Sequence, residues 1–185
     1  MVDKSYNTQL EIPQGVTVDV VGDKVSVKGS KGNIERRFIN PRVKITKNDN
    51  SLLFNCKEGI KFSQKDKMTM NTYRAHIKNM FLGVAKGYTA KLKVCSGHFP
   101  MTVTVDSNIV VIKNFLGEKV PRKARIMDGV KVQVQGDMIV INGPDKEKVG
   151  QTAATIEQTT RITNRDRRIF QDGCFIISKP GDEDE

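Results

Sequence analysis

The chain repeats its own sequence, and this duplication limits the possible folds more than any other feature. The segment "VTVDVVGDKVSVKGSKG" (16–32) aligns with "MTVTVDSNIVVIKNFLG" (101–117) at a constant offset of 85 residues. A second segment, "VKITKNDNSLLFN" (43–55), aligns with "VKVQVQGDMIVIN" (130–142) at an offset of 87 residues. Each segment alternates apolar and polar residues around a short polar turn, which is typical of two antiparallel strands. The sequence therefore predicts the same group of strands twice.

A helix is expected after the strands of each copy. In the first copy, apolar residues recur at helical spacing over residues 64–86. Ser63 and Asp66 stand where a capping pair would begin this helix, and Gly87 suits its end. In the second copy a shorter stripe has the same spacing and consists of Val149, Ala153, Ile156 and Thr160.

A glycine and an apolar strand are predicted after each helix, starting at Gly87 and at Gly173. The expected fold class is α+β, with two tandem duplicated domains that each pack a small, mainly antiparallel sheet on one helix. The predicted domains span residues 1–87 and 88–179, and residues 180–185 form an acidic tail that we expect to be disordered. One continuous sheet with two helices is the alternative, which the repeat disfavours.

The second copy contains a basic segment, "RITNRDRRIFQD" (161–172, called the insert below), between its helix and its last glycine. The first copy runs from its helix directly into Gly87, so the duplicated core does not need the insert. Arg161, Arg165 and Arg168 have the spacing i, i+4, i+7, which would place them on one side of the segment if it were helical. We expect these arginines to face outward, toward a partner.

A second basic cluster lies in "NFLGEKVPRKARI" (114–126), which is expected to be a flexible loop after a strand. A glycine-rich basic hairpin, residues 28–38, occupies a similar place in the first copy. The formal net charge is +10, an excess that favours nucleic acid or an anionic membrane surface as partner. The excess is spread over both copies, so charge alone does not select a face. The cations of the second cluster are Lys119, Arg122, Lys123 and Arg125.

No catalytic or metal-binding pattern is evident in the sequence. His76 and His98 are the only histidines, and neither has cysteine or carboxylate neighbours at the spacing of metal ligands. No apolar run is long enough for a signal peptide or a membrane span. The three cysteines are far apart, which fits a reducing compartment. We expect a protein that is not an enzyme, needs no cofactor and does not associate with a membrane.

Residues near the C-terminus match a signature specific to one family: Gln158, Ile162, Arg165, Arg168, Phe170, Asp172, Gly173 and Lys179. The motifs "HFP" (98–100) and "KNFLGEK" (113–119) fit the same family. On these grounds, residues 12–179 resemble the universal large-subunit ribosomal protein L-six in its eukaryotic and archaeal form (called L-nine in eukaryotes). The chain departs from the family at Cys174 and Phe175, where an aliphatic residue and a tyrosine are usual, and it has no tryptophan.

The resemblance implies a structural constituent of the large (60S) ribosomal subunit in the cytoplasm, and not a homo-oligomer. It implies binding to ribosomal RNA near the sarcin–ricin loop, beside stalk-base proteins and other neighbours. Phe170 is expected in the core, although it could stack with Arg168 on an unpaired base. A free RNA-binding chaperone or regulator of the same fold, and a protein-interaction adaptor, are the alternatives. The implied RNA contacts are Lys113, Lys119, Arg122, Lys123, Arg125, Arg161, Arg165, Arg167, Arg168 and Lys179.

Overall fold

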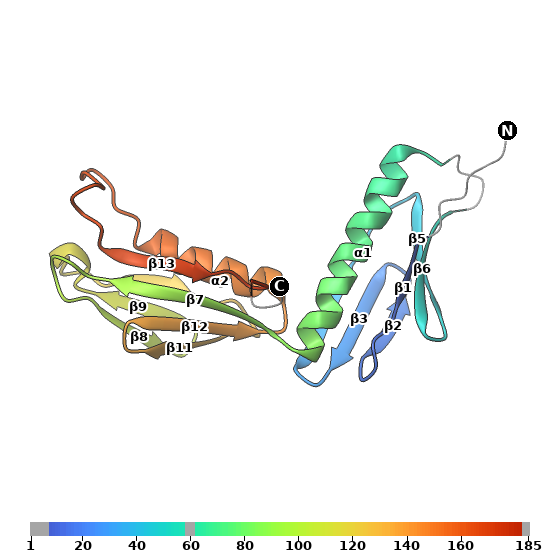
Figure 1. Cartoon of the computed structure of the whole chain (residues 1–185), viewed down its shortest axis with the longest axis horizontal. Coiled ribbons are helices and arrows are strands. Elements are labelled where there is room, and N and C mark those ends of the chain that lie inside the picture. The colour runs from blue at the N-terminus through green and yellow to red at the C-terminus, as the bar shows by residue number, and fades with distance from the viewer. Residues whose placement is uncertain (1–7, 58–61, 183–185) are drawn as a thin grey trace. The chain divides into compact units, whose positions relative to one another are not determined.

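The computed structural model describes residues 8–57 and 62–182 of the chain, which divides into two compact units, Met1–Lys86 and Gly87–Glu185 (Figure 1). Each unit combines antiparallel strands with one long helix, so the α+β class and the duplication expected from the sequence are confirmed. Residues 183–185 of the expected acidic tail lie outside the described residues.

The first unit packs two three-stranded antiparallel sheets against one helix, α1 (Gln64–Ala85). Its strands are β1 (Thr8–Glu11), β2 (Thr17–Val21), β3 (Lys24–Gly29), β4 (Gly32–Arg37), β5 (Val43–Asn48) and β6 (Ser51–Cys56). One sheet has the order β1-β6-β5 and the other β2-β3-β4. The helix contacts strands of both sheets, and its buried residues Met70, Ile77 and Val84 join them in one apolar core.

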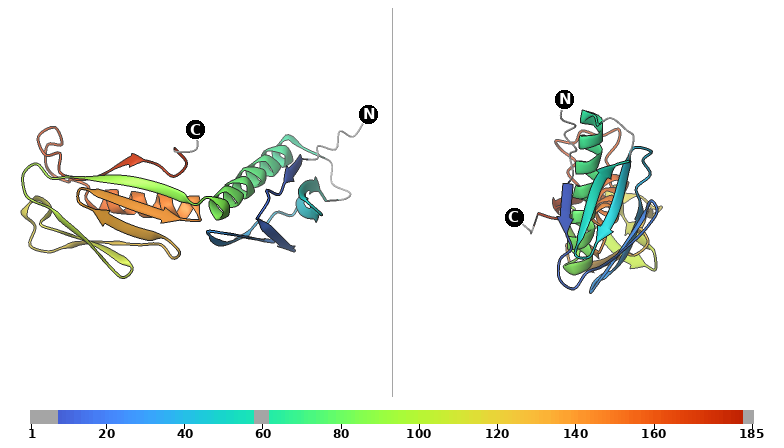
Figure 2. Two further views of the ribbon diagram at one scale, coloured as in Figure 1. Left: turned by 60° about the horizontal axis from the view of Figure 1, so that its bottom comes forward. Right: turned by 90° about the vertical axis from the view of Figure 1, so that its right-hand side faces the viewer.

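The second unit repeats this arrangement around α2 (Lys146–Thr159), with one strand more. Its elements are β7 (Tyr88–Cys95), β8 (Thr102–Asp106), β9 (Ile109–Lys113), the short 3-10 helix η1 (Phe115–Gly117), β10 (Arg122–Arg125), β11 (Lys131–Gln135), β12 (Met138–Gly143) and β13 (Gly173–Ser178). The sheets have the orders β10-β9-β8 and β11-β12-β7-β13. The left view of Figure 2 shows α2 on one face of the sheet that contains β7 and β12. The predicted stripe residues Val149, Ala153 and Ile156 are buried in α2, and Thr160 is buried directly after its last residue.

The apolar strand predicted after Gly87 is β7, and it belongs to the second unit. It pairs with β12 in the second unit, as β1 pairs with β6 in the first, so it opens the second copy and does not close the first. The apolar pattern of a strand reveals that it is buried but does not name its pairing partner. Strand β13 then pairs with the free side of β7, and the described part of the first unit contains no equivalent strand.

The predicted capping pair begins α1 and also links it to the sheet. Ser63 accepts a hydrogen bond from the backbone N–H of Lys65, and Asp66 accepts one from Ser63 N–H at 2.9 Å. The guanidinium of Arg42, just before β5, donates two hydrogen bonds of 2.7 and 2.9 Å to the buried carboxylate of Asp66. These hydrogen bonds from Arg42 outweigh the effect of burial and lower the pKa of Asp66 to about 2.

The glycine-rich hairpin between β3 and β4 closes the other end of α1. The backbone N–H of Lys31 donates to the carbonyl of Val84 at 2.9 Å, and the hydroxyl of Ser30 donates to that of Ala85 at 3.1 Å. A Cβ at Gly29 would lie 2.6 Å from the Val84 carbonyl oxygen, so the approach requires glycine. The hairpin therefore satisfies the last carbonyls of the helix, which would otherwise be unpaired.

Replacing Asp66 with asparagine is expected to lower the melting temperature of the first unit at neutral pH, because Arg42 loses its charged partner. The stabilisation from a lowered carboxyl pKa is fully present above the ordinary value of 3.8 and is lost as pH falls through about 2. The difference between wild type and Asp66→Asn, measured by circular dichroism melts, should therefore shrink between pH 4 and pH 2. The exposed Asp19→Asn is the control; a pH-independent difference for Asp66→Asn contradicts the prediction.

Candidate nucleic-acid interface

A buried carboxylate fixes the end of the insert to the rest of the second unit. Asp172, whose side chain is 2% exposed, accepts hydrogen bonds from the backbone N–H groups of Gly97 at 2.6 Å and His98 at 3.0 Å. Nδ1 of His98 lies 2.6 Å from its second oxygen, Oδ2. Burial alone raises the pKa of Asp172, but the hydrogen bonds from His98 and Gly97 outweigh burial and lower it. The loop after β7 is thereby tied to the residue before β13.

An aromatic stack extends from this anchor into the insert. The ring of Phe170 stacks on that of His98 with centroids 4.8 Å apart, and the guanidinium of Arg165 lies over the Phe170 ring at 4.9 Å. Phe170 is half-buried, so the expectation of a core position is wrong. Its cationic partner is Arg165 and not Arg168. The stack therefore restrains the position of an exposed arginine.

The insert is a series of turns, so the helical arrangement that would have aligned Arg161, Arg165 and Arg168 is wrong. The carbonyl of Asp166 accepts hydrogen bonds from Ile169 N–H and Phe170 N–H, and its carboxylate pairs with the Arg168 guanidinium at 2.7 Å. The two backbone hydrogen bonds form one isolated turn, and the Asp166 carboxylate also accepts from Arg168 N–H at 2.9 Å, so the segment does not continue as a helix. The side chain of Arg168 is still 90% exposed.

Arg122 holds the second unit together at the start of the insert. Its guanidinium makes two hydrogen bonds to Glu118, of 2.8 and 2.6 Å, and lies 4.2 Å from the ring centroid of buried Phe115. It also donates to the carbonyls of Thr159 at 2.8 Å and Arg161 at 3.3 Å, at the end of α2. These hydrogen bonds from Arg122 lower the pKa of Glu118. Arg122 therefore has the capping role at α2 that the glycine-rich hairpin has at α1.

The predicted flexible loop 114–126 is largely ordered, and this corrects the expectation for its cations. Arg122, Lys123 and Arg125 belong to β10, which pairs with β9. Ala124 is buried, so the alternation of a strand places Arg122 on the side of α2, and exposed Lys123 and Arg125 on the opposite side.

The remaining predicted contacts are distributed between two regions. Lys113 and Lys119 are exposed on either side of η1. The neighbouring Glu118 is close enough to Arg165 for the arginine charge to contribute to the lowered pKa of Glu118. Lys179 lies beyond the far end of β13, so about 20 Å of extended chain separates it from the insert. The structure therefore gathers Lys113, Lys119 and the insert at one end of the second unit and leaves Lys179 apart.

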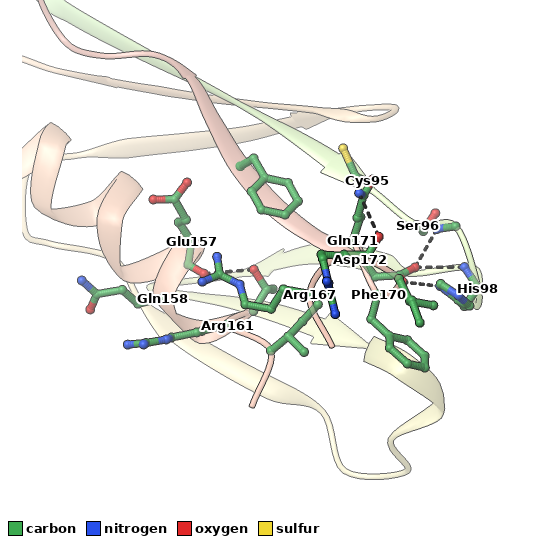
Figure 3. Close-up of a pocket in the computed structure, with 16 residues that line it drawn as sticks. Cys95, Ser96, His98, Glu157, Gln158, Arg161, Arg167, Phe170, Gln171 and Asp172 are labelled. Atoms are coloured by element: carbon green, nitrogen blue, oxygen red, sulfur yellow. Dashed lines mark hydrogen bonds and ion pairs between the residues drawn. The ribbon is translucent and has the colours of Figure 1, made fainter. Parts of the chain in front are cut away.

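A cavity of about 1150 Å³ lies between the insert, the end of α2 and the first half of β13 (Figure 3). Three insert arginines, Arg161, Arg167 and Arg168, line it. Within the described residues, the guanidiniums of Arg161 and Arg167 form no hydrogen bond or ion pair with the protein. Cationic groups that are unpaired at the edge of a cavity are suited to phosphate oxygens of a nucleic acid.

The sequence model of the family described as ribosomal protein L6 matches residues 12–87 and 99–173, which are one segment in each unit. The chain belongs to the ribosomal protein L6 family. A relative from Methanobrevibacter smithii, "Large ribosomal subunit protein uL6", is 44% identical over 179 residues, covering 97% of this chain and 99% of the relative. A relative of the same name from Sulfurisphaera tokodaii is 47% identical over 172 residues, covering 92% and 91%.

Membership of the L6 family agrees with the prediction that the chain is not an enzyme, because the relatives are ribosomal proteins. In residues 8–57 and 62–182, no three His, Cys, Asp or Glu side chains are grouped so that they could hold a metal ion. Neither of the helices in this part of the chain is long and apolar enough to cross a membrane.

Sequence reasoning missed the residues that position the insert. Asp172 belongs to the matched family signature and His98 to a short motif, but 74 residues separate them, and no spacing rule links them. The buried partner of an isolated aspartate becomes visible only in the folded chain. Apart from the family signature, the signal available at Asp172 was a carboxylate directly before a glycine and an apolar strand.

Replacing Asp172 with alanine is expected to loosen the insert while the rest of the second unit stays folded. The amides of Gly97 and His98 should exchange with deuterium about tenfold faster or more, since a hydrogen bond to a charged group contributes roughly 1.5–3 kcal/mol. Hydrogen exchange read by mass spectrometry on peptides 96–99 and 161–172 checks this. Asp166→Ala, which removes an exposed carboxylate of the same insert, is the control and should leave Gly97 and His98 protected.

Arg122→Lys is expected to lower the free energy of unfolding of the second unit by about 1–2 kcal/mol, because lysine cannot reproduce the forked hydrogen bonds. The adjacent Lys123→Ala, on the other side of β10, should change it by less than about 0.5 kcal/mol. Denaturation in guanidinium chloride compares both variants with the wild type. Equal effects of the two substitutions would show that Arg122 does not have the structural role assigned to it.

Proposed function

We propose that the chain is a structural component of the large ribosomal subunit and binds ribosomal RNA through its second unit. The observation that carries the proposal is the insert, a basic segment that only the second unit has. Its arginines are exposed, and its end is fixed by the buried Asp172. The names of the two archaeal relatives support the assignment to the large subunit.

The binding mechanism follows from the chemistry of the exposed cations. Guanidinium groups donate forked hydrogen bonds to phosphate oxygens, and neutralising phosphates releases bound counterions. Affinity should therefore fall steeply with salt. Helical RNA shows few base edges in its deep, narrow groove, so the protein recognises mainly the shape of the RNA backbone.

The RNA-binding surface that we propose combines the insert with the region around η1. Its contacts are Arg161, Arg165, Arg167 and Arg168, with Lys113 and Lys119 from the neighbouring strand end and turn. Lys123, Arg125 and Lys179 form separate, peripheral contacts, and Arg122 supports the surface from below. We propose, in line with the family resemblance, that this RNA lies near the sarcin–ricin loop and the stalk base, beside stalk-base proteins. On the ribosome, the chain would be cytoplasmic and monomeric.

Reversing two charges of the insert tests the proposal. Arg165→Glu with Arg168→Glu should reduce incorporation of a tagged chain into large subunits about tenfold or more, because several phosphate contacts become repulsive. Sedimentation of cell lysates on sucrose gradients, with and without ribonuclease, measures the incorporated fraction. The double variant should melt within a few degrees of the wild type, since both side chains are exposed.

Lys65→Glu with Lys78→Glu is the matched control, because it makes the same charge change on the exposed face of α1. This control should sediment with large subunits as the wild type does. Incorporation of the insert variant at the wild-type level would sink the proposed role of the insert. A wild-type chain found only in light fractions would favour a free RNA-binding protein of the same fold.

A further inference from the structure

An aromatic ring in the insert cavity has no stacking partner among the residues that the structure describes. Phe175, on β13, is 41% exposed and lines the cavity. Its ring lies close to Gly173, where a Cβ would approach ring atom Cζ to 3.3 Å. Within the described residues it has no aromatic or cationic neighbour, in contrast to Phe170, which contacts both His98 and Arg165. Phe175 is therefore the ring in this region that is open to stacking.

Polar groups of both hydrogen-bonding types surround this ring. One carboxylate oxygen of Glu157 accepts from the backbone N–H of Ile176 at 3.0 Å, and in the described residues the other has no hydrogen bond. The amide of Gln171 donates to the carbonyl of Arg168 at 3.3 Å, so its own oxygen stays available. Gln158 lines the same cavity and is exposed. The cavity thus offers acceptors and donors beside an apolar platform.

Positive charge borders the same cavity. Arg161 and Arg167 lie on its wall, and neither guanidinium is neutralised by a carboxylate of the described chain (Figure 3). A flat ring, hydrogen-bonding side chains and nearby cations together match the three parts of a nucleotide. A base stacks on the ring, its edge takes the hydrogen bonds, and its phosphate meets the arginines.

We propose that this cavity receives one unpaired base of the bound RNA, stacked on Phe175, with its edge toward Glu157 and Gln158 and its phosphate beside Arg161 and Arg167. The inference rests on the proposed function, because it takes the insert as the RNA-binding surface. It adds a second form of recognition to the phosphate contacts. A helical stem alone would satisfy the arginines, whereas the cavity requires a nucleotide that is displaced from the stem.

A pair of synthetic RNA hairpins tests the inference with the full chain. One hairpin carries a single bulged 2-aminopurine, and the other carries the same base paired within the stem. Anisotropy of a terminal dye gives affinity, and 2-aminopurine fluorescence reports stacking. The wild type should bind the bulged hairpin about tenfold more tightly, with quenching, because base–aromatic stacking contributes roughly 1–3 kcal/mol per base.

Two substitutions of Phe175 separate the ring from its volume. Phe175→Leu keeps an apolar side chain but lacks the flat face, so it should lose the tenfold preference and the quenching, yet bind the paired hairpin as the wild type does. Phe175→Tyr keeps the ring and should keep the preference. Both conserve volume well enough to leave the melting temperature close to that of the wild type.

Failure of the inference and failure of the proposed function give different results. Equal affinity of the wild type for both hairpins, or an unchanged preference in Phe175→Leu, overturns the base site while RNA binding stands. Binding to neither hairpin at physiological salt overturns both. Displacement of the bulged hairpin by submillimolar adenosine monophosphate would assign the cavity to a free nucleotide and overturn its assignment to RNA.

Discussion

The position of the insert depends on one buried carboxylate. Asp172 ties a loop that follows β7 to the residue before β13, and the insert ends at this tie. A carboxylate that is 2% exposed is stable there only because three donors from two successive residues satisfy it. The His98 ring, fixed by the same carboxylate, in turn supports Phe170 and Arg165. A basic segment without regular secondary structure is thereby held in a defined position, which would lower the entropy lost on binding the proposed RNA.

The duplicated units reach similar ends by different chemistry. The C-terminal end of the helix is closed by the β3–β4 hairpin in the first unit and by the first residue of β10 in the second. In the first unit, the Ser30 hydroxyl and the Lys31 backbone N–H of the glycine-rich hairpin donate to the last helix carbonyls. In the second unit, the guanidinium of Arg122 donates to the carbonyls at the end of the helix. The insert leaves the helix at this end of α2. Arg122, which the sequence analysis gave as an RNA contact, thus has a structural role that counting charged residues does not reveal.

Sequence patterns between neighbouring residues predicted the secondary structure and the helix cap. Alternation located the repeated strands, helical periodicity located α1 and the stripe of α2, and the capping pair at Ser63 and Asp66 was found from spacing alone. The errors concern contacts between distant residues. The pairing of β7 with β12, the placement of Arg122 against α2 and the tie of His98 to Asp172 join residues 37 or more positions apart. The spacing of the insert arginines would align their side chains only in a helix, and the structure has a single turn around Asp166 instead.

The order of the strands along the chain determines which unit can fold during synthesis. All strand partners of the first unit lie between residues 8 and 56, and its helix ends at Ala85, so this unit can fold while the rest of the chain is still being synthesised. The second unit cannot complete its folding before the last strand has been synthesised. Its central strand β7 emerges first, but one flank of β7 waits for β13, and the carboxylate that orders the insert directly precedes that strand. The ordered arginine cluster therefore forms only after β13 has been synthesised and has paired with β7, so earlier nascent chains do not present it to unrelated RNA.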